Sequence, residues 1–417
     1  MRAFNGSLSL MIAVFMVSVL TFGIMAADEN APVKPGVEML FESEKNTKLI
    51  MGKRVGLITN PTGIDRNFNS TIDLLAEHPA CELVALFGPE HGLRGDYFAG
   101  AQVKESVDEK TGVTIYSLYG SGKHAPSQDI LKKLDILIYD IQDIGVRPYT
   151  YISTMLASME AAKEAGISFM VLDRPCPMGG DVIDGPVLDP EFKSFIGYWT
   201  IPYTYGLTPG ELAIFYNKEE KLGADLHVIK MEGWKRGMTY DETGLPWVPP
   251  STHIPRWDTS IFCAITGGMG ELHTVNEGVG YTLPFEIVGA PWIDGTKFAD
   301  ELNSRGIPGV KFRPISYKPA YFAFEGKNCS GAHIYIMDVS KIKPYFTGIQ
   351  IMDAINRMYP EQDMFTGSRV SAFNRAMGTD EIREMLMNKK PMGEIFGSYQ
   401  EGIEEYKEKR EKYLLYE

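Results

Sequence analysis

The sequence predicts an α/β protein with a Rossmann-like, largely parallel sheet and a second, smaller α/β or α+β domain, with a cleft between them. The chain has 417 residues, 44% of them hydrophobic, which suits about two domains. Apolar strand-like runs alternate with helical patterns up to about residue 175. From about residue 185, Pro, Gly and aromatic residues dominate instead. We therefore expect a first domain at 28–185 and a second at 186–417.

Five runs in the first domain read as strands. They are nearly continuous in Val, Ile and Leu, as expected for strands whose two faces are both buried. The runs are residues 53–60, 82–90, 112–120, 134–143 and 167–175.

Helical patterns separate some of these strands. Residues 69–79 open with an Asn/Ser cap and stop at Pro79, and residues 150–166 end at Gly166. This alternation favours a parallel sheet with helices on both faces, although an α+β arrangement of the same pieces stays open.

The second domain mixes short strands and helices. Residues 331–339 predict a strand, and residues 348–360 and 398–416 predict helices. The stretch "GGMGELHTVNEGVG" at 267–280 reads as a polar loop, unsuited to strand or helix, that serves as a lid or opposing wall.

The N-terminus predicts a signal peptide over residues 1–27. Arg2 precedes an apolar run at 10–26, which ends in small residues and is followed by an acidic, Pro-containing segment. A single membrane anchor is the alternative. We expect cleavage, no stable membrane insertion afterwards, and a periplasmic or secreted protein.

Charge and composition exclude several partners. The net charge of −13, with no continuous basic face, argues against nucleic acid. There is no strand–GxGxxG–helix phosphate loop, and neither the four Cys nor the seven His follow a metal-ligand spacing. We expect no cofactor and no bound metal.

Polar residues follow the predicted strands at their carboxyl ends, where open parallel sheets bind ligands. Asn60, Glu90 and Asp143 stand at three of these ends and are predicted to face substrate. Arg147 follows Asp140 and Asp143, and an Asp–Arg pair among these three is expected to act as a scaffold behind the site, with Arg147 also a substrate-binding candidate.

The stretch "FGPEHGLRGD" at 87–96 is the strongest candidate for chemistry. Gly88, Pro89 and Gly92 hold Glu90 rigidly at the sheet edge, where a partly desolvated carboxyl suits a general acid. His91 is predicted to orient or polarise Glu90, and Arg94 to help hold it.

The second domain supplies further candidates. Glu271 and Glu277 lie in the glycine-flanked stretch at 267–280. Aromatic side chains stack on sugar rings but more often fill cores, so we expect two or three of the following to contact ligand: Tyr198, Trp199, Tyr203, Tyr205, Trp257, Tyr281 and Trp292.

Ordered blocks from about residue 37 to the C-terminus resemble one family. They read "GLITNPTGID", "FGPEHGLRGD", "AGAQV", "YDIQDIGVRPYTYISTM", "VLDRPCPMGG", "GPVLDPEFKSFIG", "TPGELA", "EGVGYTLPFEIVGAPWID" and "YLLY". The chain thus resembles the bacterial exo-β-N-acetylmuramidases of the NamZ type, a glycoside hydrolase family. The resemblance implies a Rossmann-like domain joined to a smaller one, release of terminal N-acetylmuramic acid from peptidoglycan disaccharides or muropeptides, and Glu90 as leading catalytic residue.

Some positions depart from the family pattern. Thr204-Tyr205 stand where the family usually has Arg-His, and Val279 and Leu283 stand where basic residues are common. A planar guanidinium is the natural partner of the lactyl carboxylate of muramic acid. We therefore expect Arg256 to replace one lost basic group, and Tyr205 to contact substrate.

The mechanism expected is acid catalysis by Glu90 with a second carboxylate as nucleophile or base, taken from Asp143, Glu271 or Glu277. Retention, inversion and substrate-assisted attack by the 2-acetamido group all stay open. Two other classes also stay open. One is an inactive wall-fragment binding protein, and the other is a metal-dependent hydrolase using His91, Asp140, Asp143 and Asp173.

Overall fold

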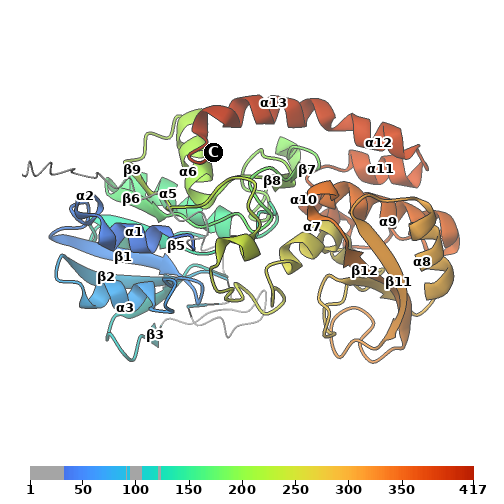
Figure 1. The fold of residues 1–417 in the computed structure, drawn as a ribbon, viewed down its shortest axis with the longest axis horizontal. Coiled ribbons are helices and arrows are strands. Elements are labelled where there is room, and N and C mark those ends of the chain that lie inside the picture. Colours follow the sequence, from blue (N-terminus) through green and yellow to red (C-terminus); the bar gives the residue numbers. More distant parts are fainter. Residues whose placement is uncertain (1–31, 91, 94–105, 121–123) are drawn as a thin grey trace, which may run out of the picture. The chain divides into compact units, whose positions relative to one another are not determined.

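The first sheet is seven-stranded and almost entirely parallel. The computed structural model describes residues 32–90, 92–93, 106–120 and 124–417. The strand order is β3-β4-β2-β1-β5-β6-β9, and only β3 runs antiparallel to its neighbour (Figure 1). The strands are β1 (Lys53–Thr59), β2 (Cys81–Gly88), β3 (Ser106–Val107), β4 (Thr114–Ser117), β5 (Ile136–Asp140), β6 (Ser168–Leu172) and β9 (Leu226–Ile229).

Helices cover both faces of this sheet, as the apolar runs predicted. In β5, Ile136 and Ile138 pack into one core cluster, and Leu137 and Tyr139 into the other. The first cluster includes α1 (Gly36–Glu42) and α3 (Thr71–Glu77). The second includes α4 (Gln128–Leu131), α5 (Tyr151–Ala165) and α6 (Pro209–Glu219). The short helix α2 (Glu44–Thr47) follows α1.

Local signals in the sequence set the ends of these helices. The Ser70 side chain accepts a hydrogen bond from the Ile72 N–H at the start of α3. Gly166 ends α5 in a left-handed conformation, with φ of 71°. Thr208 and Glu211 form a reciprocal capping box at the start of α6. The helices predicted over 69–79 and 150–166 are therefore confirmed.

The sheet takes its last strand from beyond residue 185. β9 pairs in parallel with β6, from Phe169 opposite Leu226 to Leu172 opposite Ile229. The seven-stranded sheet therefore reaches residue 229, while the division into domains at residue 185 stays a prediction. A two-stranded ribbon of β7 (Ile183–Asp184) and β8 (Thr204–Tyr205) lies within the intervening segment.

The second sheet is smaller and antiparallel, in the order β10-β12-β11. It consists of β10 (Ile287–Ala290), β11 (Val310–Tyr317) and β12 (Cys329–Ile336), accompanied by α7 (Thr259–Gly270), α8 (Gly295–Ser304) and α9 (Pro344–Met358). The strand predicted at 331–339 and the helix predicted at 348–360 are thus confirmed.

One local prediction was wrong. Residues 267–270 were expected to form a loop because of their glycines, yet they form the last turn of α7. Ile261, Phe262, Ile265 and Met269 of α7 are all buried, so tertiary packing overrides the low helix propensity of glycine. Glycine also suits the helix sterically, since a Cβ at Gly270 would stand 2.7 Å from the Glu277 Cδ.

The C-terminal helices join the two sheets. They are α10 (Val370–Met377), α11 (Glu381–Met387), α12 (Met392–Ser398) and α13 (Gln400–Arg410), and α13 runs from α12 back to α6 (Figure 1). The Tyr406 hydroxyl donates to the Tyr205 carbonyl at 2.7 Å, and the Tyr416 hydroxyl donates to Asp173 Oδ2 at 2.6 Å. Residues 32–417 accordingly form one compact unit.

Two further features concern the predicted setting. Among the helices of the described residues, none combines the length and apolar character needed to cross a bilayer. All four cysteines are free thiols. The predicted signal peptide at 1–27 lies outside the described residues.

Candidate active site

Glu90 stands two residues beyond the end of β2, at the carboxyl edge of the parallel sheet. The Thr150 hydroxyl donates a hydrogen bond to Glu90 Oε2 at 2.6 Å. The Tyr151 hydroxyl lies 3.5 Å from the Glu90 carbonyl oxygen. Thr150 is the N-cap of α5 and Tyr151 is its first residue, so the start of the helix that follows β5 positions the carboxyl that follows β2.

The Tyr151 hydroxyl connects Glu90 to Asn60. It donates to the Pro250 carbonyl at 2.5 Å, and the Asn60 amide donates to the same carbonyl at 3.4 Å. Asn60 Oδ1 in turn accepts from the Thr62 hydroxyl at 2.6 Å. Burial raises the pKa of Tyr151, which keeps its hydroxyl neutral and able to donate. We call Asn60, Glu90, Thr150, Tyr151 and Pro250 the Glu90 cluster.

Asp143 is a buried carboxyl beside this cluster. Its Oδ2 accepts short hydrogen bonds from the Tyr205 hydroxyl and, at 2.7 Å, from the Gly145 N–H. Its Oδ1 is buried and has no hydrogen-bond partner among the described residues. Burial raises the pKa of Asp143 to about 6, although the Tyr205 and Gly145 donors favour the charged form. Asp143 therefore titrates close to neutral pH.

Glu277 is a second buried carboxyl, only 2% exposed. Its Oε2 has no hydrogen-bond partner within the described part of the chain, and burial raises its pKa to about 8. Cys263 of α7 lies close enough to interact electrostatically with both Glu277 and Asp143; burial first, and these two carboxyls next, raise the pKa of its thiol to about 12. Cys263 therefore lies within electrostatic range of both buried carboxyls.

Arg147 lies away from these carboxyls. It is buried, and its guanidinium donates to the carbonyls of Pro186 at 3.0 Å, Ile201 at 2.8 Å and Ala376 at 3.3 Å. Arg147 therefore has a structural role, because it holds three backbone segments together.

The scaffold ion pair is formed by a different arginine from the one we expected. Arg174 Nε and Nη2 donate to the two oxygens of Asp140 at 2.5 and 2.9 Å, both residues being buried. Since Arg174 reaches back from the end of β6, the Asp–Arg pair holds neighbouring strand ends together.

The remaining predicted residues are paired with other side chains or lie outside the described chain. Arg256 donates to Glu286 at 2.7 Å and to Asp258 at 3.1 Å. Glu271 accepts from Arg369 at 3.2 Å through its carboxylate. His91 and Arg94 lie outside the described residues.

Sequence reasoning missed Thr150 and Tyr151. Both lie in "RPYTYISTM", where a predicted strand end passes into a predicted helix. A run of hydroxyl side chains at that position could have indicated them, because the carboxyl edge of the sheet and the start of a helix meet there.

The aromatic candidates divide by exposure. Trp199, Tyr203 and Tyr205 are buried, whereas Tyr281 is 37% exposed. Three of the seven candidates therefore fill the core, and Tyr198, Trp257 and Trp292 are partly buried against it.

Asp173, named for the metal alternative, serves the fold. It accepts from the Thr208 hydroxyl at 2.8 Å, the Gly210 N–H at 2.8 Å and the Tyr416 hydroxyl at 2.6 Å. No three His, Cys, Asp or Glu side chains of the described residues gather in a way that suits a metal ion.

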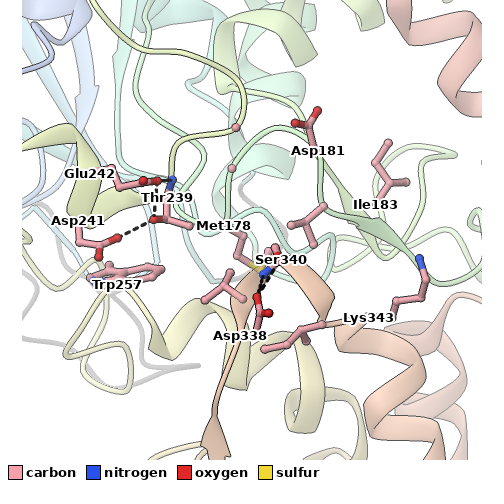
Figure 2. Close-up of a pocket in the computed structure, with 15 residues that line it drawn as sticks. Met178, Asp181, Ile183, Thr239, Asp241, Glu242, Trp257, Asp338, Ser340 and Lys343 are labelled. Carbon is pink, nitrogen blue, oxygen red and sulfur yellow. Dashed lines mark hydrogen bonds between the residues drawn. The ribbon is translucent and has the colours of Figure 1, made fainter. Parts of the chain in front are cut away.

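A cavity of about 640 Å³ lies elsewhere, between segments 178–183, 237–242 and 338–343, with Trp257 at its wall (Figure 2). Three of the four acidic residues that line it have local partners: Asp241 and Glu242 accept from Thr239, and Asp338 accepts from Ser340 (Figure 2). No member of the Glu90 cluster lines this cavity, so we do not assign the chemistry to it.

Comparison with known proteins gives a consistent result. Family models described as exo-β-N-acetylmuramidase NamZ match the chain, the N-terminal one over residues 55–258 and the C-terminal one over 265–416. The chain is 43% identical to the peptidoglycan β-N-acetylmuramidase NamZ of Bacillus subtilis (strain 168), covering 96% of this chain and 98% of that protein.

Two solved structures are also similar, both DUF1343 family proteins of Bacteroides fragilis NCTC 9343. One has a TM-score of 0.87 and 42% identity, and the other has a TM-score of 0.74 and 30% identity. Each comparison covers 93% of this chain and 99% of the other.

Proposed function

The chain belongs to the exo-β-N-acetylmuramidase NamZ family, and from this membership we propose that it is a glycoside hydrolase that releases terminal β-1,4-linked N-acetylmuramic acid from peptidoglycan fragments. The structural observation that carries the proposal is the position of Glu90. A carboxyl at the carboxyl edge of a parallel sheet, fixed by Thr150, is suited to meet a glycosidic oxygen.

In the proposed reaction, Glu90 donates its proton to the leaving glycosidic oxygen as the bond from the sugar C1 to that oxygen breaks. Water then supplies the hydroxyl at C1, and its remaining proton restores Glu90 directly or through a second group. The Thr150 hydroxyl positions Glu90 by holding one carboxylate oxygen.

The second carboxylate is best sought in Asp143. One of its oxygens has no hydrogen-bond partner among the described residues, and its pKa of about 6 leaves it ionised at neutral pH. Glu277 has a similar orphan oxygen, but its pKa of about 8 keeps it protonated there, and the Glu271 carboxylate is engaged by Arg369. The separation of Asp143 from Glu90 in a substrate complex would set the stereochemical course, about 5–5.5 Å for retention and about 6.5–9.5 Å for inversion.

We extend the proposal to substrate form and location. The substrates are disaccharides or muropeptides derived from peptidoglycan, and the enzyme works in the periplasm or after secretion. The N-terminal sequence supports this location, because Arg2, the apolar run and the small residues at Ala26-Ala27 follow the order of a signal peptide.

Product analysis tests the proposal. The protein is incubated with para-nitrophenyl β-glycosides of N-acetylmuramic acid and of N-acetylglucosamine, which differ in the lactyl ether. We expect nitrophenol and free N-acetylmuramic acid from the first and much slower release from the second. If calorimetry shows tight binding of muropeptides but no product forms, the proposed enzymatic activity is contradicted. The protein would then be a wall-fragment binding protein.

A further inference from the structure

Three exposed aromatic side chains gather on two loops of the second sheet's region. Tyr281, Tyr321 and Phe322 are 37%, 43% and 43% exposed. Among the described residues, they make up three of the nine large hydrophobic side chains that are exposed at all. We call these three side chains the aromatic rim. Such a grouping of apolar surface marks a binding site more often than single exposed residues do.

The two loops that carry the rim are joined by hydrogen bonds. The Ala320 N–H donates to the Gly280 carbonyl at 2.7 Å, and the Asn276 amide donates to the carbonyls of Val279 at 2.9 Å and Ala323 at 3.2 Å. A Cβ at Gly280 would lie 2.1 Å from the Tyr321 carbonyl oxygen, so this close approach requires glycine. These contacts fix the two loops relative to each other, so the aromatic rim is a structurally defined surface.

The backbone around the rim is strained. Phe322 and Phe324 have φ values of 71° and 62°, and His273, which packs edge-on against Phe322 with ring centroids 4.4 Å apart, has φ of 58°. Bulky residues adopt this left-handed region rarely, and such strain concentrates at functional sites. Here the strained backbone presents an apolar ring to solvent, which folding alone does not favour.

A short segment ties the rim to the Glu90 cluster. His253 Nε2 lies 2.9 Å from the Tyr321 hydroxyl, and three residues earlier the Pro250 carbonyl accepts from Tyr151 and Asn60. Three residues of chain span at most about 10 Å, so the backbone of His253, whose ring contacts Tyr321, lies close to the Pro250 carbonyl of the Glu90 cluster. The Tyr281 loop also follows Glu277 directly in the chain.

We propose that the aromatic rim binds the amino-sugar units that follow the terminal residue of the substrate glycan. This inference rests on the proposed function, because an exo-acting enzyme holds the end sugar at its acid and must accommodate the rest of the chain beyond it. Flat aromatic faces stack on the apolar C–H faces of pyranose rings, which is the contact expected from Tyr281, Tyr321 and Phe322.

The experiment compares a short and a long substrate. We measure kcat and KM of the wild type, Tyr321→Ala and Tyr281→Ala on para-nitrophenyl β-N-acetylmuramide and on a peptidoglycan tetrasaccharide with N-acetylmuramic acid at its non-reducing end. We expect the kcat/KM of each variant on the tetrasaccharide to fall roughly tenfold through KM, with the small glycoside unaffected. An equal fall in kcat/KM on both substrates, or no fall on either, would contradict the proposal that the aromatic rim binds the following sugar units.

Tyr335→Ala is the matched control. Tyr335 is 40% exposed, but it lies near the far end of β12, where its hydroxyl accepts from Arg313 at 3.1 Å. It should act as the wild type on both substrates, and a loss on the tetrasaccharide equal to that of Tyr321→Ala would count against a specific rim.

A calorimetric titration separates this inference from the proposed function. If the wild type releases N-acetylmuramic acid from neither substrate, the proposed function fails. Tetrasaccharide binding by wild type and Tyr321→Ala is then still measured, and a tenfold weaker affinity of the variant upholds the rim as a glycan site, whereas equal affinity rejects it.

Discussion

The Thr150 hydroxyl donates a 2.6 Å hydrogen bond to Glu90 Oε2, and this contact joins the end of β2 to the start of α5. It fixes the direction of the carboxyl that we propose as the acid. Thr150→Val keeps the branched shape but removes the donor, so Glu90 gains rotational freedom. A correctly placed general acid contributes about 10²–10⁴-fold, and a misdirected one loses part of that, so we expect kcat to fall roughly 10–100-fold.

Thr150→Ser provides the comparison for this variant, because serine retains a hydroxyl at the same position. It should recover most of the wild-type kcat on the nitrophenyl muramide. If Thr150→Val and Thr150→Ser are equally impaired, packing of the threonine methyl matters and the hydrogen bond does not.

Glu90→Gln removes the proposed acid while keeping its size. General acid catalysis contributes about 10²–10⁴-fold, and we expect a loss of kcat in that range with a Tm close to that of the wild type. Glu82→Gln, at the exposed opposite end of the same strand, is the control and should keep full activity. Near-normal turnover by Glu90→Gln would remove Glu90 from the mechanism.

The central strands β1, β2, β5 and β6 were predictable because they are largely buried on both faces and their apolar runs are therefore continuous. The edge strands β3 and β9 are exposed or half-buried, and the sequence did not predict them. The end of α7 was not predictable either, since the glycines at 267–270 signal a loop locally while buried packing of Ile265 and Met269 makes a helix. Tertiary packing of this kind has no signature within a short window of sequence.

The candidate active site was likewise predictable only in part. Glu90 and Asn60 could be placed because they follow strands, and the edge of a parallel sheet collects such residues. The pairing of Asp140 with Arg174, and the separation of Arg147 from both acids, depends on how side chains from distant strand ends point. Spacing along the chain alone does not determine that choice.

The buried pair of Asp140 and Arg174 gives a stability prediction. Removing one partner of a buried ion pair leaves an uncompensated charge, so Arg174→Leu should destabilise the protein by about 3–5 kcal/mol. Arg54→Leu is the matched control: Arg54 also binds an aspartate through two nitrogens, at 3.1 and 2.9 Å, but on the surface. That exposed, solvent-screened pair should contribute far less to stability than the buried one. Urea unfolding gives the free energy of unfolding of each variant. Similar losses of stability in the two variants would contradict the prediction that the buried pair matters more.

Tyr205→Phe tests the environment of Asp143. The Tyr205 hydroxyl stabilises the charged form of a carboxyl whose pKa burial has raised to about 6. Without this donor the pKa of Asp143 rises further, so the cost is largest where the wild-type carboxyl is ionised. We expect about 1.5–3 kcal/mol of lost stability at pH 7.5 and clearly less at pH 5. Tyr335→Phe, at an exposed tyrosine, should show no such pH dependence in urea unfolding.

Glu277 gives a prediction with a defined sign. Burial raises its pKa from 4.5 to about 8 in the folded protein. Between these values the unfolded chain has lost the proton while the folded protein keeps it, so the stability of the wild type falls as the pH rises through this window. Glu277→Gln cannot ionise and lacks this loss. Its free energy of unfolding should therefore gain on that of the wild type between pH 5 and pH 8, by at most about 1.4 kcal/mol per pH unit.

The comparison variant for Glu277→Gln is Asp294→Asn. Hydrogen bonds from Lys297 lower the pKa of Asp294 from 3.8, so this carboxyl is ionised in both folded and unfolded states between pH 5 and pH 8. Its difference from the wild type should stay constant across the window. Urea unfolding of all three proteins at pH 5, 6.5 and 8 decides the matter. If the Glu277→Gln curve runs parallel to the wild type, Glu277 is ionised in the fold and cannot hold a proton near its free oxygen at neutral pH.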